Sequence, residues 1–107
     1  MDKFGLREHD LELIINLISQ YPSINEAVIF GSRAKNNYRN GSDVDIALKG
    51  AEITSELINN ISYILNEETL LPYKFDILNY HEIKTIELID HIDRVGISIY
   101  KKVSDFE

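Results

Sequence analysis

The chain reads Ala27-Val28-Ile29-Phe30-Gly31-Ser32-Arg33-Ala34 and, after residues 35–42, Asp43-Val44-Asp45-Ile46-Ala47-Leu48, and this stretch decides its fold. Each part contains an apolar run of strand length, and Gly31-Ser32 forms a turn after the first run. Side chains alternate between the two faces of a strand, so Asp43 and Asp45 face one way and Val44 the other. The stretch therefore predicts two strands, with paired carboxylates at the start of the second.

The paired carboxylates indicate that a cation binds between them. Like charges on one face repel each other and are costly to remove from water, and a divalent metal ion relieves both effects. The backbone N–H groups and the hydroxyl of the Gly31-Ser32 turn are suited to bind a phosphate. Together these features indicate metal-assisted chemistry on a phosphate ester.

Asp76 is a third candidate, because it is a lone acid within the apolar strand predicted at residues 74–78. If that strand lies beside residues 43–48, Asp76 joins Asp43 and Asp45 on one face of the sheet. Three carboxylates of this kind suit Mg²⁺, and a pair of such ions stabilises both oxygens of an in-line displacement. Each feature alone is also typical of a solvated strand end, so the prediction rests on their joint occurrence.

The remaining pattern predicts an α/β (α+β) domain, with helices packed on a small mixed and mostly antiparallel sheet. Helices are expected at residues 7–20, 33–38, 53–66 and 83–94, and strands at 27–30, 43–48, 74–78 and 97–100. The connection between the first two strands is short for a parallel crossover, so this pair is expected to be antiparallel. Ser32 is expected to cap the short helix, the last strand to lie at an edge, and residues 104–107 to fray. In the last helix the expected buried residues are Ile86, Ile89 and Ile92.

Composition limits the possible function classes. The 107 residues suffice for one domain, and 44% hydrophobic with 27% charged residues is typical of a soluble globular protein. The net charge of −7 argues against a broad nucleic-acid surface, and it fits either a basic protein partner or a plain solvated surface. The absence of cysteine excludes disulfides and thiolate metal sites. No signal peptide or membrane span is recognisable, so a cytoplasmic protein without membrane contact is expected.

At these motifs the chain resembles the minimal nucleotidyltransferase (MNT) domains of the polymerase-β-like superfamily. The family pattern is Gly-Ser, ten residues, Asp-x-Asp and a third Asp on a later strand, matched here by Gly31-Ser32, Asp43-x-Asp45 and Asp76. The resemblance covers nearly the whole chain, so residues 1–107 are expected to form one such domain with the polymerase-β-like fold. One departure is Asn36, where relatives often carry glycine, and Asn tolerates the left-handed turn.

The resemblance implies transfer of AMP from ATP to a hydroxyl group, with two Mg²⁺ ions and release of pyrophosphate. Asp43, Asp45 and Asp76 would be the catalytic metal ligands, and Asp76 would help to deprotonate the attacking hydroxyl. Gly31 and Ser32 would hold the terminal phosphates. Arg33 would contact phosphate or, equally, be a helix-surface residue without a role.

The resemblance also implies a partner. Small stand-alone members of the family are typically paired with a HEPN-domain ribonuclease toxin, so this chain would be an antitoxin. It would form a hetero-oligomer with the toxin and transfer AMP to a toxin tyrosine. Two alternatives stay open: a non-catalytic module that neutralises the toxin by binding, and a nucleotidyltransferase that acts on a small molecule.

Other candidate residues and enzyme classes have weaker support. The three histidines lie on different predicted elements without metal-ligand spacing and are expected at the surface: His9, His81 and His91. Three tyrosines could stack on a base, although core or turn roles are more common: Tyr38, Tyr73 and Tyr80. No P-loop sequence is present. Asp-x-Asp also occurs in phosphohydrolases and nucleotide-sugar glycosyltransferases, but those chains are larger and do not account for Gly31-Ser32.

Overall fold

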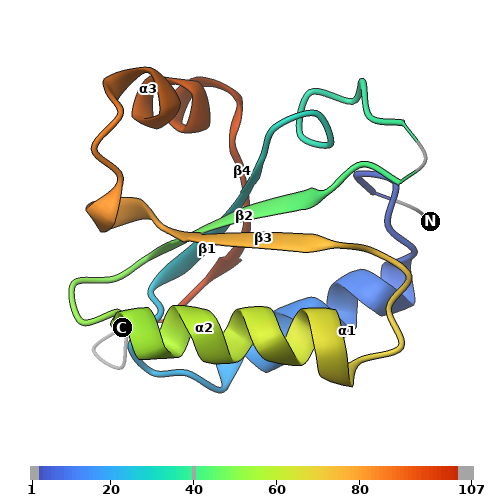
Figure 1. The fold of residues 1–107 in the computed structure, drawn as a ribbon, viewed down its shortest axis with the longest axis horizontal. Coiled ribbons are helices and arrows are strands. Elements are labelled where there is room, and N and C mark those ends of the chain that lie inside the picture. The colour runs from blue at the N-terminus through green and yellow to red at the C-terminus, as the bar shows by residue number, and fades with distance from the viewer. Residues whose placement is uncertain (1–2, 40, 104–107) are drawn as a thin grey trace.

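The computed structural model describes residues 3–39 and 41–103, which form a four-stranded sheet between helices (Figure 1). The helices are α1 (Glu8–Ser19), α2 (Ser55–Tyr63) and α3 (Ile86–Val95), and the strands are β1 (Glu26–Phe30), β2 (Val44–Lys49), β3 (Phe75–Asn79) and β4 (Ile97–Lys101). A π-helical turn at Ile64–Glu68 extends α2, and a 3₁₀ turn at Tyr80–Glu82 follows β3. The three longer predicted helices and all four predicted strands are confirmed, with ends displaced by a few residues.

The strand order β3-β2-β1-β4 confirms a mixed and mostly antiparallel sheet. Strand β1 pairs antiparallel with both β2 and β4, whereas β2 and β3 run parallel. The predicted antiparallel pairing of the first two strands and the edge position of β4 are therefore correct. In this register Asp45 of β2 lies opposite Phe30 on one side and opposite Asp76 on the other.

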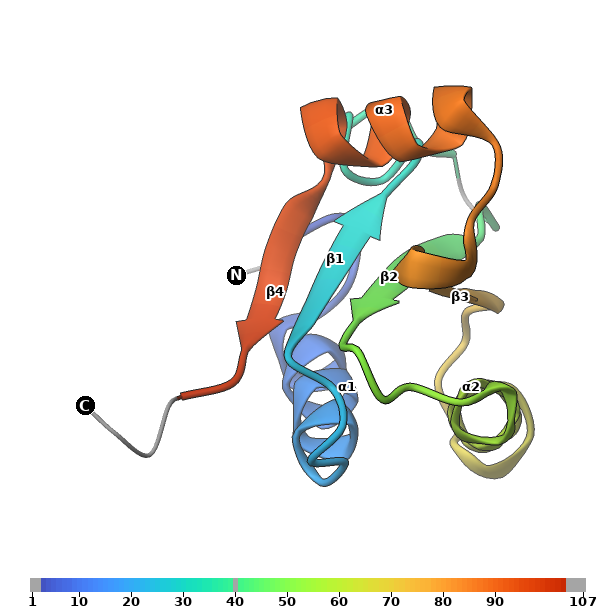
Figure 2. The same ribbon diagram turned by 90° about the vertical axis from the view of Figure 1, so that its left-hand side faces the viewer.

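Different helices pack on the two faces of the sheet. Figure 2 shows α1 and α2 on one side of the sheet and α3 on the other. Fully buried side chains such as Ile14, Ile46 and Ile61 form the main core under α1 and α2. A smaller core, which includes Ala47 and Ile92, lies under α3. Because side chains alternate along a strand, Asp45 shares the α3 face with Ala47, and Asp76 shares it with Leu78.

The prediction of a short helix at residues 33–38 is wrong, because Gly31 to Asn36 forms turns instead. Asn36 has a φ of +63°, a left-handed conformation that stops helix growth after one turn. Ser32 was predicted to cap this helix with its side chain, and it does not. Its backbone carbonyl accepts a hydrogen bond from the Asn37 N–H. Asn36 does take the left-handed conformation that the sequence allowed it.

Ile86 was predicted to be buried, and this is also wrong, because 76% of it is exposed. It is the first residue of α3, and the small core under that helix is closed by Ile92 with Leu88 and Ile83. The expected fraying of residues 104–107 concerns positions outside the described residues. In the segments 3–39 and 41–103, no helix is long and apolar enough to cross a membrane.

Candidate active site

Two of the three predicted acids lie on neighbouring strands, and the third directly precedes one of them. Asp45 and Asp76 are direct partners in the parallel β2–β3 ladder, so the condition set for Asp76 by the sequence is met. Asp43 immediately precedes β2, at the point where the Val44 N–H donates to the Lys74 carbonyl over 2.8 Å. Strand pairing therefore brings all three carboxylates to one end of the sheet, on the face shared with α3.

The charges at this end of the sheet affect one another. The pKa of Asp45 rises from its ordinary value of 3.8 to about 6, firstly because burial removes its carboxylate from water. The nearby charges of Asp76 and Asp43 raise the pKa further, and the Arg33 guanidinium lowers it. Asp45 is thus the central acid of the group, and an added cation would relieve the repulsion that it experiences.

Gly31 lies directly against the central acid. Its φ is +78°, which glycine adopts readily and other residues avoid, and a Cβ at this position would overlap the Asp45 carboxylate. The family resemblance implied that Gly31 helps to hold the terminal phosphates, which stays a prediction. The structure provides a separate reason for glycine, namely that the Gly31 backbone and the Asp45 side chain occupy adjoining space. The glycine–serine turn therefore adjoins the acids.

Arg33 is not a residue of a helix surface, because it lies in the turn region and only 4% of it is exposed. Its Nη2 donates to the Ser42 carbonyl and its Nη1 to the Phe4 carbonyl, each over 2.8 Å. Its Nε lies 3.3 Å from the carbonyl oxygens of Ser42 and Asp43. The predicted contact of Arg33 with phosphate stays a prediction, and the contacts present in this structure are with the backbone next to the acids.

The donor set suits a hard divalent cation, since it consists of three carboxylates and the charges of Asp76 and Asp43 raise the pKa of Asp45. The set is not a ready-made metal site, however. In the part of the chain that the structure describes, no three side chains of the His, Cys, Asp and Glu types are gathered closely enough to hold a metal ion. The three acids therefore have the right donor atoms for a metal ion and lie on the same face of the sheet. They would have to move closer together to share one ion.

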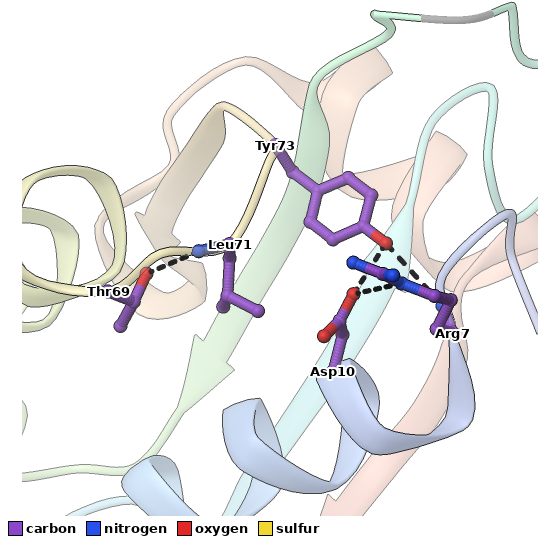
Figure 3. A network of polar contacts seen from close by, with 5 residues as sticks. All are labelled: Arg7, Asp10, Thr69, Leu71 and Tyr73. Carbon is purple, nitrogen blue, oxygen red and sulfur yellow. Dashed lines mark hydrogen bonds and ion pairs between the residues drawn. The ribbon is translucent and has the colours of Figure 1, made fainter.

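A polar network that joins the start of α1 to the segment before β3 was missed by the sequence analysis (Figure 3). The Tyr73 hydroxyl donates to Oδ2 of the buried Asp10 over 2.8 Å, and Nε of Arg7 donates to the same oxygen over 3.2 Å. The helical spacing carried a signal, because Asp10 precedes the buried Ile14 by one turn and so belongs to the apolar stripe of α1. Its partner Tyr73 lies 63 residues away, and no local pattern indicates that pairing.

The histidines and tyrosines have structural environments. His9 and His81 are exposed, and His91 packs edge-on against Phe30 with 6.3 Å between ring centroids. The Tyr80 hydroxyl donates to Asp93 over 2.7 Å. His9 and His81 thus have the predicted surface positions, whereas His91 is half-buried against the core residue Phe30. The position of Tyr80 in a turn agrees with the roles expected for the tyrosines.

The comparison with protein families matches residues 12–105 to the model described as polymerase beta, nucleotidyltransferase. This match includes Gly31-Ser32 and all three acids. No curated protein sequence matches the chain.

Several solved structures share the fold. A toxin–antitoxin complex with AMP-PNP contains a chain with a TM-score of 0.70 and 18% identity, over 91% of this chain and 75% of that one. A mutant of the toxin–antitoxin MntA–HpeT gives a TM-score of 0.68 at 18% identity, with coverage of 91% and 75%. A complex of tri-AMPylated Shewanella oneidensis HEPN toxin with MNT antitoxin gives 0.54 at 19% identity, with coverage of 86% and 73%. At these identities the likeness establishes the fold.

Proposed function

The chain belongs to the polymerase β nucleotidyltransferase family, and on that premise we propose that it transfers AMP from ATP to a hydroxyl group. The observation that carries the proposal is that Asp43, Asp45 and Asp76 lie at one end of the sheet, with Gly31 against Asp45. A single domain spanning residues 1–107 is part of the proposal, as are a cytoplasmic location and independence of nucleic acid and membrane.

In the proposed reaction the acceptor oxygen forms a bond to the α-phosphorus of ATP, and the bond from that phosphorus to the bridging oxygen breaks. Pyrophosphate leaves, and the acceptor proton passes to the Asp76 carboxylate and then to water. Asp43, Asp45 and Asp76 would hold two Mg²⁺ ions, which stabilise the negative charge on the attacking and leaving oxygens. The Ser32 hydroxyl and the N–H groups around Gly31 would orient the terminal phosphates, because such turns present donors to anions.

The exposure of the acids suits these roles. Asp76 is the second residue of β3 and its side chain is exposed, so an acceptor from another molecule can reach it. Asp45 is more enclosed and lies between Gly31 and Asp76, so it is the acid that would hold metal next to the Gly31-Ser32 turn.

For the acceptor we propose a tyrosine of a cognate HEPN-domain toxin, which makes the chain the antitoxin of a two-protein pair. Support comes from the fold neighbours, which include an MNT antitoxin in complex with a tri-AMPylated HEPN toxin and a toxin–antitoxin complex with AMP-PNP. The net charge of −7 is compatible with a basic partner surface. Modification of the toxin would then block its ribonuclease activity.

The test is a reaction of the purified chain with α-labelled ATP, Mg²⁺ and the HEPN protein encoded beside it. We expect label on the partner and release of pyrophosphate in equal amounts. The Asp43→Asn, Asp45→Asn double variant is the matched control, because it removes two charges with little change of shape and is expected to fold. No label from folded wild-type protein would contradict the proposal.

The same double variant separates the two remaining candidates. If it still protects cells from the toxin fully, the chain acts by binding alone, as a stoichiometric antitoxin. A nucleotidyltransferase for a small molecule would instead release pyrophosphate with small-molecule hydroxyl acceptors and leave the toxin unlabelled.

A further inference from the structure

Arg33 is a buried cation whose hydrogen bonds join the start of the chain to the segment that carries Asp43. The nitrogen atoms of its guanidinium contact the carbonyl oxygens of Phe4, Ser42 and Asp43. A planar guanidinium presents five N–H donors in a fixed fork, so contacts at several of its nitrogen atoms define the position of the chain around it. A residue with only 4% exposure that holds the backbone next to an acid is well placed to orient that acid.

Arg33 is itself held firmly. Its Cζ lies 5.2 Å from the ring centre of Tyr38 and 5.5 Å from that of Tyr73. A Cβ on Gly5, which has a φ of +73°, would come within 2.7 Å of Nη1, so the N-terminal turn also packs tightly on it. The Tyr73 hydroxyl in turn donates to the buried Asp10, as Figure 3 shows. Three separate parts of the chain thus enclose the guanidinium.

The contacts lie where the predicted metal site needs support. The described residues between β1 and β2, 31–39 and 41–43, form turns and irregular backbone, and a connection of this kind does not by itself hold Asp43 in one position. Asp43 precedes β2, so it lacks the ladder pairing that fixes Asp45 opposite Asp76. The Val44 N–H already anchors the far side of Asp43 to the Lys74 carbonyl, and Arg33 adds a restraint on the near side. Its Nε reaches the carbonyl of Asp43 and its Nη2 the carbonyl of Ser42.

We propose that Arg33 is a positioning residue, which fixes the Ser42–Asp43 backbone so that the Asp43 carboxylate can join Asp45 and Asp76 around a divalent cation. The inference rests on the proposed function and adds to it a residue that need not touch metal or nucleotide. Residues that orient metal ligands typically change metal affinity by about 10- to 100-fold when they are replaced. The same range is expected here.

The experiment measures binding of Mn²⁺, as a probe for Mg²⁺, to the full chain by electron paramagnetic resonance. The variants are Arg33→Gln, Arg33→Lys, Asp43→Asn and, as the matched control, Arg39→Gln. Arg39 belongs to the same connection and carries the same charge, but it is exposed and contacts Ser42 through its backbone N–H. Thermal unfolding of each variant reports whether it is folded.

We expect Arg33→Gln to weaken Mn²⁺ binding about tenfold or more and Arg39→Gln to change it less than twofold. Arg33→Lys keeps the charge but replaces the fork by one ammonium group, so an intermediate loss is expected. If Arg33→Gln does not fold, Arg33→Lys decides. In the transfer reaction, a high Mg²⁺ concentration should restore the kcat of Arg33→Lys, because all three metal ligands are present. It should not restore the kcat of Asp43→Asn, which lacks a ligand. If Arg33 had only a structural role, a high Mg²⁺ concentration would not distinguish the two variants.

Each outcome bears on a different claim. Wild-type affinity for Mn²⁺ in folded Arg33 variants would overturn the positioning role and leave the metal site intact. Equal losses in Arg33→Gln and Arg39→Gln would also overturn it, because they would reduce the effect to loss of charge. Failure of the folded wild type to bind Mn²⁺, or binding that Asp43→Asn does not weaken, would overturn the proposed metal site and the positioning role with it.

Discussion

Replacing Asp45 by asparagine is expected to stabilise the metal-free protein at neutral pH. The pKa of Asp45 is about 6 in the folded chain against an ordinary value of 3.8, a difference of about two units. At about 1.4 kcal/mol per unit the upper limit is about 3 kcal/mol. The carboxylate is partly exposed, and solvent screening reduces the expected effect to about 1 kcal/mol. Asparagine has almost the same shape and no charge, so it removes the repulsion with little other change.

The sign of the effect depends on pH in a defined way. A raised pKa favours the folded state while the group is protonated, so this contribution is fully present below pH 3.8 and is lost as the pH rises through about 6. The advantage of Asp45→Asn should therefore be largest above pH 7 and shrink steadily as the pH falls from 7.5 to 4.5.

The assay is urea unfolding of both proteins in EDTA at pH 7.5, 6.0 and 4.5, with exposed Glu52→Gln as the control for loss of one negative charge. An Asp45→Asn protein that is no more stable than wild type at pH 7.5 would refute the reasoning. A gain that does not change with pH, or an equal gain in Glu52→Gln, would refute it as well.

Three further predictions concern the glycine turn, the buried network and the acids. Gly31→Ala should destabilise the chain by about 1–2 kcal/mol, because alanine is strained at the positive φ of this position. It should also abolish transfer, because the added Cβ overlaps the Asp45 carboxylate. Gly41→Ala is the control: Gly41 has a φ of +85° and open space around it, so this variant should show only the stability loss in urea unfolding. Tyr73→Phe should lower the free energy of unfolding by about 1–2 kcal/mol, because buried Asp10 loses its 2.8 Å hydrogen bond, and an unchanged urea midpoint would contradict this. Mg²⁺ should raise the thermal midpoint of the wild type and have a clearly smaller effect on Asp43→Asn, and equal shifts in scanning fluorimetry would argue against the metal site.

Local pattern predicted the strands and the face that the acids share. The alternation of Asp43, Val44 and Asp45 is a property of any strand, and it holds whatever the neighbours are. The sequence could only assume that the strand of Asp76 lies beside the strand of Asp45. The structure meets this condition, with β3 parallel to β2 and Asp76 opposite Asp45.

What could not be predicted depends on contacts between distant residues. Arg33 was predicted either to contact phosphate or to lie on a helix surface without a role. Tertiary contacts with Phe4 and Ser42 bury it in a turn instead of on a helix surface, and no local pattern indicates them. The hydrogen bond between Asp10 and Tyr73 has no local signal for the same reason. Ile86 has the spacing of a buried residue, but its position at the start of α3 leaves it beyond the small core.

The central claim is that Asp43, Asp45 and Asp76 transfer a nucleoside monophosphate. The most direct measurement follows α-labelled ATP and pyrophosphate release in one reaction with Mg²⁺ and the cognate HEPN protein. The account predicts one pyrophosphate for each AMP attached, and no attachment by folded Asp43→Asn, Asp45→Asn protein. Label transfer that survives in the double variant, or folded wild-type protein that releases no pyrophosphate, would contradict it.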